Sequence, residues 1–134
     1  MRFFLAPIFC LGLCLTLVTP VWAKTPLSQV SEIDDGLMAI AIADEIRKSC
    51  GDISARMIRA YRQIQALEQR AKALGYSDAE IDAYVNSKAE KKRMRKKAET
   101  WLASKGIAAN DEKALCKFGR DDIARGGPVG YFLR

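Results

Sequence analysis

Hydrophobic residues recur every three or four positions along most of the chain, which is the spacing of one face of an α-helix. The clearest run lies between Asp52, the predicted N-cap, and Gly75, the predicted stop. Its apolar positions are Ile53, Met57, Tyr61, Ile64, Leu67, Ala71 and Leu74. Arginine, glutamine and glutamate occupy the other faces and are typical of a solvated surface, so we expect the apolar face to be buried.

A second helix is predicted over residues 31–50. Two apolar stripes run along it, formed by Val30, Ile33, Leu37, Ile40 and Ala41 and by Met38, Ile42 and Ile46. A segment that is apolar on most sides is typical of a central helix covered by several others. Asp34 and Asp35 would lie in its first turn and Arg47 and Lys48 in its last turn, where their charges suit the helix dipole.

Residues 78–104 predict two helices rather than one straight helix. The apolar face of the first part consists of Ile81, Tyr84 and Val85, and that of the second part consists of Met94, Ala98 and Trp101. On one straight helix these two faces would lie more than about 90° apart around the axis. Two capping boxes, each a serine followed three residues later by a glutamate, begin at Ser77 and Ser87. We therefore expect a bend near Asn86 and Ser87 and a further helix that ends at about Ser104.

The C-terminal part predicts a short fifth helix, capped by Asn110–Asp111 and stopped at Gly119, and then a helical turn over residues 121–125. The apolar residues 131–133 are expected to pack back onto the domain, because exposed apolar chain ends favour aggregation. The alternative is that they are exposed for docking. No alternation typical of a β-strand appears, so the predicted fold class is all-α, a small bundle of about four to five helices.

The first 23 residues differ from the rest of the chain. Arg2 is basic, residues 3–19 are almost continuously apolar, and Pro20 ends this run. Residues 21–23, Val-Trp-Ala, place small side chains at the two positions that a signal peptidase recognises. This pattern predicts a secretory signal peptide that is cleaved after Ala23, and hence a periplasmic protein.

The remaining residues, 24–134, have the length of about one domain. Residues 24–30 are expected to form a short mobile leader. No stretch after residue 23 approaches about 18 consecutive apolar residues, so no transmembrane span is expected after processing.

Four cysteines reduce to two after processing, because Cys10 and Cys14 lie in the signal peptide. Cys50 and Cys116 remain, and an even pair in an exported chain predicts a disulfide. The bond would close a loop of about 65 residues, which the chain-entropy account credits with about 4 kcal/mol. Two buried free thiols are the alternative.

The residue types available argue against enzyme chemistry. The chain has no histidine, which excludes histidine-based catalytic triads and metal sites and the usual general base at neutral pH. The adjacent carboxylates Asp34–Asp35 and Asp121–Asp122 would point about 100° apart on a helix, and each pair is better explained as charge at a helix N-terminus. We expect no catalytic residues, no metal and no cofactor, with an unrecognised enzyme as the alternative.

The segment between residues 88 and 97 is unusually basic. Glu90 is its only acid, and seven of its ten residues are Lys88, Lys91, Lys92, Arg93, Arg95, Lys96 and Lys97. It carries the whole positive excess of residues 24–134. We interpret it as a candidate interaction surface for an acidic protein or an anionic membrane surface; the alternative is a solvated face that maintains solubility. Nucleic acid is not expected, because export separates the protein from it and no aromatic residue interleaves for base stacking.

The C-terminal pattern Leu115-Cys116, Gly119-Arg120, Ile123-Ala124, Gly130 and Leu133-Arg134, together with the predicted signal peptide and Cys50, resembles a family of small uncharacterised exported proteins from alphaproteobacteria. The resemblance covers nearly all of residues 24–134. It implies a domain of unknown function without an established activity, and it supplies no catalytic residues. On the residues themselves we expect a non-enzymatic periplasmic binding or accessory protein. If family members are encoded near genes for respiratory NADH:quinone oxidoreductase, the resemblance alternatively implies an accessory subunit docked on that membrane complex.

We predict that the mature protein begins at Lys24, because the apolar run and the Val-Trp-Ala ending place the cleavage after Ala23. The intact mass of the exported protein measures this directly. Retention of residues 1–23 in a membrane-bound form would contradict both the cleavage and the periplasmic location.

Overall fold

A computed structural model describes residues 23–134. Within this range the chain forms five α-helices and two short 3-10 helices: η1 (Leu27–Gln29), α1 (Ser31–Ser49), α2 (Met57–Ala73), α3 (Asp78–Asn86), α4 (Lys88–Ser104), α5 (Glu112–Ala124) and η2 (Gly130–Phe132). The β-structure of the described range is one isolated bridge, between Ala55 and Leu133. The predicted all-α class is confirmed. The predicted signal peptide, with Cys10 and Cys14, lies outside the described residues except for Ala23.

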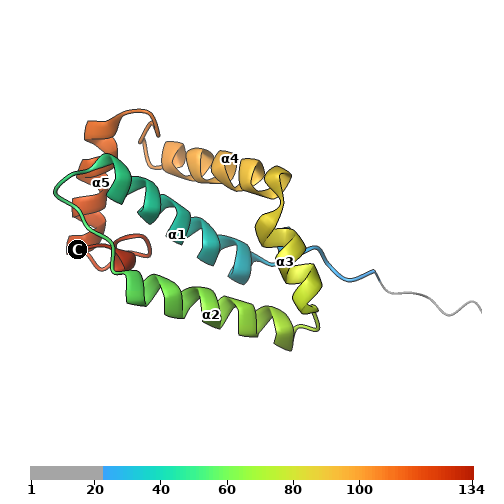
Figure 1. Cartoon of the computed structure of the whole chain (residues 1–134). Helices are drawn as coiled ribbons and strands as arrows, with labels where there is room; N and C mark the ends of the chain where they lie inside the picture. The colour runs from blue at the N-terminus through green and yellow to red at the C-terminus, as the bar shows by residue number, and fades with distance from the viewer. Residues whose placement is uncertain (1–22) are drawn as a thin grey trace, which may run out of the picture.

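The central helix of the fold is α1. In Figure 1, α4 and α2 lie on opposite sides of α1, α5 crosses one of its ends, and α3 connects α2 to α4 near the other. Ile42 and Ile46 are the most deeply buried apolar side chains of α1, at 2 % and 0 % exposure. They belong to a core that also holds Leu102 of α4 and Leu115 of α5. This arrangement confirms the central helix that the two apolar stripes predict.

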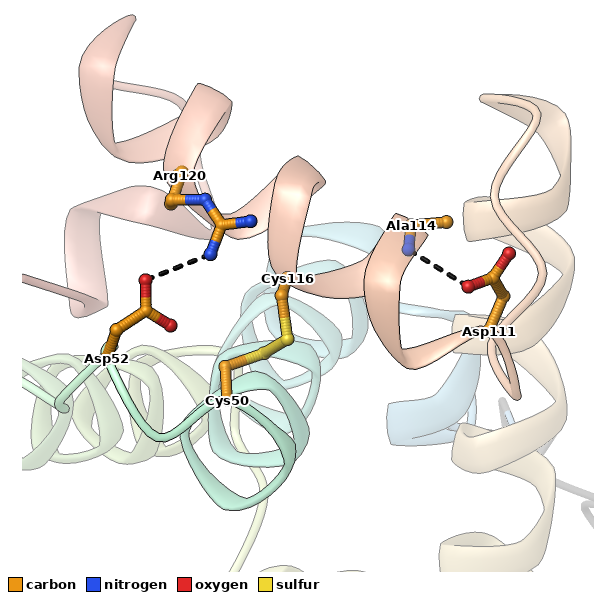
Figure 2. Close-up of a disulfide and its surroundings, with 6 residues drawn as sticks. All are labelled: Cys50, Asp52, Asp111, Ala114, Cys116 and Arg120. Carbon is orange, nitrogen blue, oxygen red and sulfur yellow. Dashed lines mark hydrogen bonds and ion pairs between the residues drawn. A yellow bond between two sulfur atoms is a disulfide. The ribbon is translucent and has the colours of Figure 1, made fainter.

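A disulfide joins the end of α1 to α5. Cys50 follows α1 directly and Cys116 lies within α5, with Cα atoms 5.7 Å apart and a sequence separation of 66. Figure 2 shows that Asp52, beside this bond, accepts a hydrogen bond of 2.9 Å from Arg120. The sequence pattern predicts Asp52 as the N-cap of α2, and this prediction is wrong. The helix α2 begins only at Met57 and has no side-chain cap.

The helix α5 runs through Gly119 rather than stopping there, which corrects the prediction of a helix followed by a separate turn. A Cβ atom at residue 119 would lie 2.8 Å from Ile46 Cγ2 and 3.0 Å from Ile53 Cδ1. The glycine lets α5 approach α1 closely, and this packing outweighs the weak helix propensity of glycine. The predicted cap is present, since Asp111 accepts a hydrogen bond from the Ala114 N–H.

The predicted break between α3 and α4 is confirmed at Ser87, whose extended backbone separates the two helices. The capping box at Ser77 is complete, because Ser77 Oγ accepts from the Glu80 N–H and Glu80 accepts from the Ser77 N–H. The Ser77 N–H and the Lys24 ammonium lower the pKa of Glu80 to about 2. The second box is only half formed, because the Ser87 side chain caps α4 while the Glu90 carboxylate binds elsewhere.

Residues 24–30 contact the domain, which does not match the expectation of a mobile leader. Leu27 is buried in a second apolar cluster with Ile33 of α1 and Ile81 of α3. The Lys24 ammonium lies 2.9 Å from a Glu80 carboxylate oxygen. The sequence pattern missed this packing because one apolar side chain in a short segment has no periodicity.

The C-terminal segment packs back onto the domain as predicted at Phe132 and Leu133, which are buried, while Tyr131 is 49 % exposed. Its backbone accepts a hydrogen bond from the Arg56 N–H at Phe132 O, 2.7 Å away. Asp122 holds the start of the segment, since its buried carboxylate accepts from the N–H groups of Val129 and Gly130 at 2.9 and 2.7 Å. The interpretation of Asp122 as helix N-terminal charge is therefore wrong, because it lies near the C-terminal end of α5.

The predicted apolar face of α2 is buried only in its second half. Leu67 and Ala71 pack toward α1. The Leu67 side chain lies so close to Gly36 that a Cβ atom at residue 36 would have little room. The first turns of α2 are exposed and carry Met57 (63 %), Ile58 (69 %), Tyr61 (62 %) and Ile64 (43 %). We call these four residues the α2 apolar patch. It is a correction to the expectation that this whole face is buried.

The two halves of α2 should respond differently to substitution. Leu67→Ala should lower the free energy of unfolding by about 2–4 kcal/mol, because it leaves a cavity. Ile58→Gln should change it by less than about 0.5 kcal/mol, because the side chain is already in water. Urea denaturation of both variants measures the difference. Equal destabilisation by the two substitutions would contradict this packing of α2.

Candidate functional site

A buried carboxylate links three helices at the N-terminal end of α1. Asp34 is 1 % exposed. Tyr84 Oη of α3 donates to Asp34 Oδ1 at 2.6 Å, and Lys97 Nζ of α4 donates to Oδ2 at 2.5 Å. The Arg93 guanidinium of α4 donates to both carboxylate oxygens. We call these four side chains the Asp34 cluster.

Further carboxylates complete the cluster at its edge. Lys97 also binds Asp35, and Arg93 also binds Glu90 through a hydrogen bond of 2.6 Å. The Arg93 and Lys97 side chains are about one-third exposed, at 35 % and 32 %. The cations therefore bridge a buried carboxylate and partly solvated ones, which is an arrangement that satisfies the buried charge.

The cluster shifts the ionisation of its members. Burial by itself raises the pKa of Asp34, but hydrogen bonds from Arg93, Lys97 and Tyr84 outweigh it and leave the pKa below its usual range. Burial and the Asp34 carboxylate raise the pKa of Tyr84. Burial lowers the pKa of Lys97, but the bonds to Asp34 and Asp35 reverse this and raise it. All four groups thus hold their ordinary charge states at neutral pH.

The structure divides the basic segment 88–97 into two groups. Arg93 and Lys97 turn toward α1 and belong to the Asp34 cluster, so they are not part of a free interaction surface. The other five cations are exposed and make no ion pair with any residue between 23 and 134: Lys88, Lys91, Lys92, Arg95 and Lys96. We call these five residues the α4 basic face.

The sequence interpretation missed the Asp34 cluster because an aspartate in the first turn of a helix is explained by the dipole alone. One signal was present in the sequence. Arg93 and Lys97, four residues apart, lie on the flank of α4 next to its apolar positions Met94 and Trp101. Cations at the edge of a buried face indicate a carboxylate on the facing helix, although its identity does not follow from the pattern.

A groove of about 640 Å³ lies beside the Asp34 cluster, between α1, α4 and the C-terminal segment. Apolar side chains form most of it, among them Met38 and Ile42 of α1, Trp101 of α4 and Val129. Trp101 also packs edge-to-face on Phe118, with ring centroids 5.9 Å apart. The prediction of Trp101 as a core residue thus holds in part, because Trp101 is half-buried against the core and also lines the groove. We call this space the α1/α4 groove.

Two features are absent from residues 23–134. No helix in that range has both the length and the apolar composition needed to cross a membrane. The same range contains no cluster of three or more histidine, cysteine, aspartate or glutamate side chains placed to bind a metal ion.

Comparison with known proteins yields one match. The model of a family of unknown function, DUF5333, matches residues 25–134, which includes the Asp34 cluster and both disulfide cysteines. No curated protein and no solved structure matches the chain.

The Asp34 cluster should make stability depend on acid pH. The pKa of Asp34 is lower in the folded than in the unfolded protein, so its contribution is present above about pH 4 and is lost as the pH falls through the folded value. Asp34→Asn should cost about 2–3 kcal/mol at pH 7, and the difference from wild type should shrink below pH 4. Urea denaturation from pH 7 to pH 2 measures this difference.

Asp44→Asn is the matched control, because Asp44 also binds two cations but is 40 % exposed. Its cost should stay below about 1 kcal/mol, since exposed ion pairs contribute little. An Asp34→Asn difference that stays constant across this pH range would contradict the account of the cluster.

Proposed function

The chain belongs to this family of unknown function, DUF5333, and for this chain we propose a non-enzymatic binding or accessory role in which the α4 basic face holds an acidic protein partner. One observation carries the proposal. Five cations of one helix are exposed together and lack carboxylate partners within the part of the chain that the structure describes.

The spacing of these cations favours a partner over simple solubility. Lys88, Lys92 and Lys96 follow one another at intervals of four residues, so their ammonium groups lie one turn apart. Like charges at this spacing destabilise a helix by about 0.2–0.5 kcal/mol per pair. Carboxylates of a partner would relieve this repulsion, and the concentrated charge would speed the encounter.

The composition of the exposed side of α4 favours an acidic protein over a membrane surface. Helices that lie in a membrane interface combine cations with large apolar side chains that enter the lipid. Besides the cations, the exposed positions of α4 are Ala89, Glu99, Thr100, Ala103 and Ser104, with no large apolar side chain. An acidic surface of a soluble protein and one on a respiratory membrane complex offer this face the same chemistry.

Intramolecular bonds to the buried carboxylates support a role without catalysis. Asp34 is engaged by two cations and a tyrosine, and Asp122 by Arg125 and two backbone N–H groups. A general base needs an accessible lone pair near its substrate, which these contacts occupy. The proposal includes export to the periplasm, which the pattern of residues 1–23 and the Cys50–Cys116 disulfide support.

The test combines pull-down from native cells with charge reversal. Lys88→Glu together with Lys92→Glu should leave the fold intact, because both positions are exposed. The double variant should capture much less of any partner held by the wild type, chiefly through slower association. Wild-type capture should fall steeply from low to physiological salt, because exposed charges are screened over about 8–10 Å.

Arg62→Glu together with Lys113→Glu is the matched control, since it changes the net charge equally at exposed positions outside α4. This control should bind as the wild type does. Equal capture by the Lys88/Lys92 double variant and the wild type at low salt would show that the α4 basic face is only a solvated surface.

A further inference from the structure

Beyond the proposed function, we propose that the α1/α4 groove binds a free amphiphile with a single alkyl chain and an anionic headgroup. The groove lies next to the α4 basic face but is formed by other side chains, apart from Lys96. Its shape, its composition and the order of charged and apolar residues along it support this class of ligand.

The groove changes from charged to apolar along its length. The helices α1 and α4 run side by side in the same direction (Figure 1). On α1 the charged Asp35 is followed by Met38 and Ile42, and on α4 the lining begins with cations and continues to Trp101. Both walls therefore place their charges at the end next to α3 and their apolar side chains toward α5. An amphiphile has the same order, with one charged end and one apolar chain.

The floor of the apolar end is formed by buried side chains. Ile42 and Val129 are 2 % and 1 % exposed, and Met38 is also buried. The volume of about 640 Å³ lies within the range of about 300–1,000 Å³ that small-molecule sites occupy. The lining on α4 extends from Arg93 to Ser104, which is about 16 Å at 1.5 Å per residue. A medium-length alkyl chain laid in the groove would remove its own surface from water, together with that of Ala39, Trp101 and Pro128, the apolar lining residues that remain partly exposed.

The charged end has a free cation. Asp34 and Asp35 engage Arg93 and Lys97, which fixes the positions of both cations. Lys96 also lines this end, is exposed, and makes no ion pair within residues 23–134. A carboxylate headgroup would thus meet the Lys96 ammonium beside a preorganised cluster, and a cationic headgroup would meet a like charge.

The α2 apolar patch provides a natural comparison within the same molecule. It exposes more apolar side chain than the groove, but Figure 1 places α2 on the opposite side of α1. No groove residue belongs to the patch. An amphiphile that adsorbs to any apolar surface would therefore be detected on α2, and one that needs the charge order of the groove would not.

The test titrates the full-length protein with sodium dodecanoate below its critical micelle concentration. Binding is followed by the NMR signals of the Trp101 indole N–H and the Met38 methyl group. Trp101→Phe identifies the indole signal against that of Trp22. We expect saturable shifts of both groove signals with dodecanoate, and at least tenfold weaker binding of dodecyltrimethylammonium. Comparable binding of the two amphiphiles would overturn the proposal.

Variants locate the ligand. Thr100→Phe introduces a ring into the groove from an exposed position and should weaken dodecanoate binding at least tenfold. Lys96→Gln should weaken it about threefold or more through loss of the headgroup contact. Ile58→Gln in the α2 apolar patch is the matched control and should bind as the wild type does. Unchanged binding by Thr100→Phe, or lost binding by Ile58→Gln, would refute the groove as the site.

Two more measurements distinguish this proposal from the acidic-partner proposal and from binding of membrane lipid. The Lys88→Glu and Lys92→Glu double variant should bind dodecanoate within twofold of the wild-type affinity. The acidic-partner proposal and the groove proposal can therefore fail independently of each other. Phosphatidylglycerol vesicles test a membrane source. Displacement of dodecanoate from the groove by these vesicles would assign the site to membrane lipid and overturn the proposal of a free amphiphile.

Discussion

The burial of the Asp34 carboxylate sets how α4 packs on α1. An ionised carboxylate at 1 % exposure is tolerated only with cations and hydrogen-bond donors around it. Both cations come from one side of α4, so this requirement fixes which side of α4 faces α1. The remaining cations of α4 must then point to water, and they form the α4 basic face. The same contact sets the charged end of the α1/α4 groove.

The opposite end of α1 is held by different chemistry. There the Cys50–Cys116 disulfide ties α1 to α5, and Asp122 ties α5 to the C-terminal segment. Val129, whose N–H binds Asp122, also closes the apolar end of the groove. The groove therefore lies between the ionic contact that joins α1 to α4 and the disulfide and Asp122 contacts that join α1, α5 and the C-terminal segment.

Helical periodicity, capping boxes and the cysteine pair were sufficient to predict the five helices, the break at Ser87 and the disulfide. The helices and the break follow from local signals, and the disulfide follows from the even number of cysteines in a chain predicted to be exported. What periodicity could not supply was the distance between helices. From the sequence alone, Gly119 predicts the end of a helix, but in the fold it permits α5 to cross α1 closely. The first turns of α2 repeat apolar residues at helical spacing, yet no helix within residues 23–134 covers them. The partners of Asp34 lie about 60 residues away in the sequence, beyond the reach of any pattern.

A double-mutant cycle on Asp34 and Arg93 tests the central claim most directly. The free energies of unfolding of wild type, Asp34→Asn, Arg93→Met and the double variant give the coupling between the two side chains. A direct contact between a buried carboxylate and its principal cation predicts a coupling of about 1–3 kcal/mol at pH 7. Costs that add to within about 0.5 kcal/mol would show that Asp34 does not orient α4, and the account of both the α4 basic face and the groove would fail.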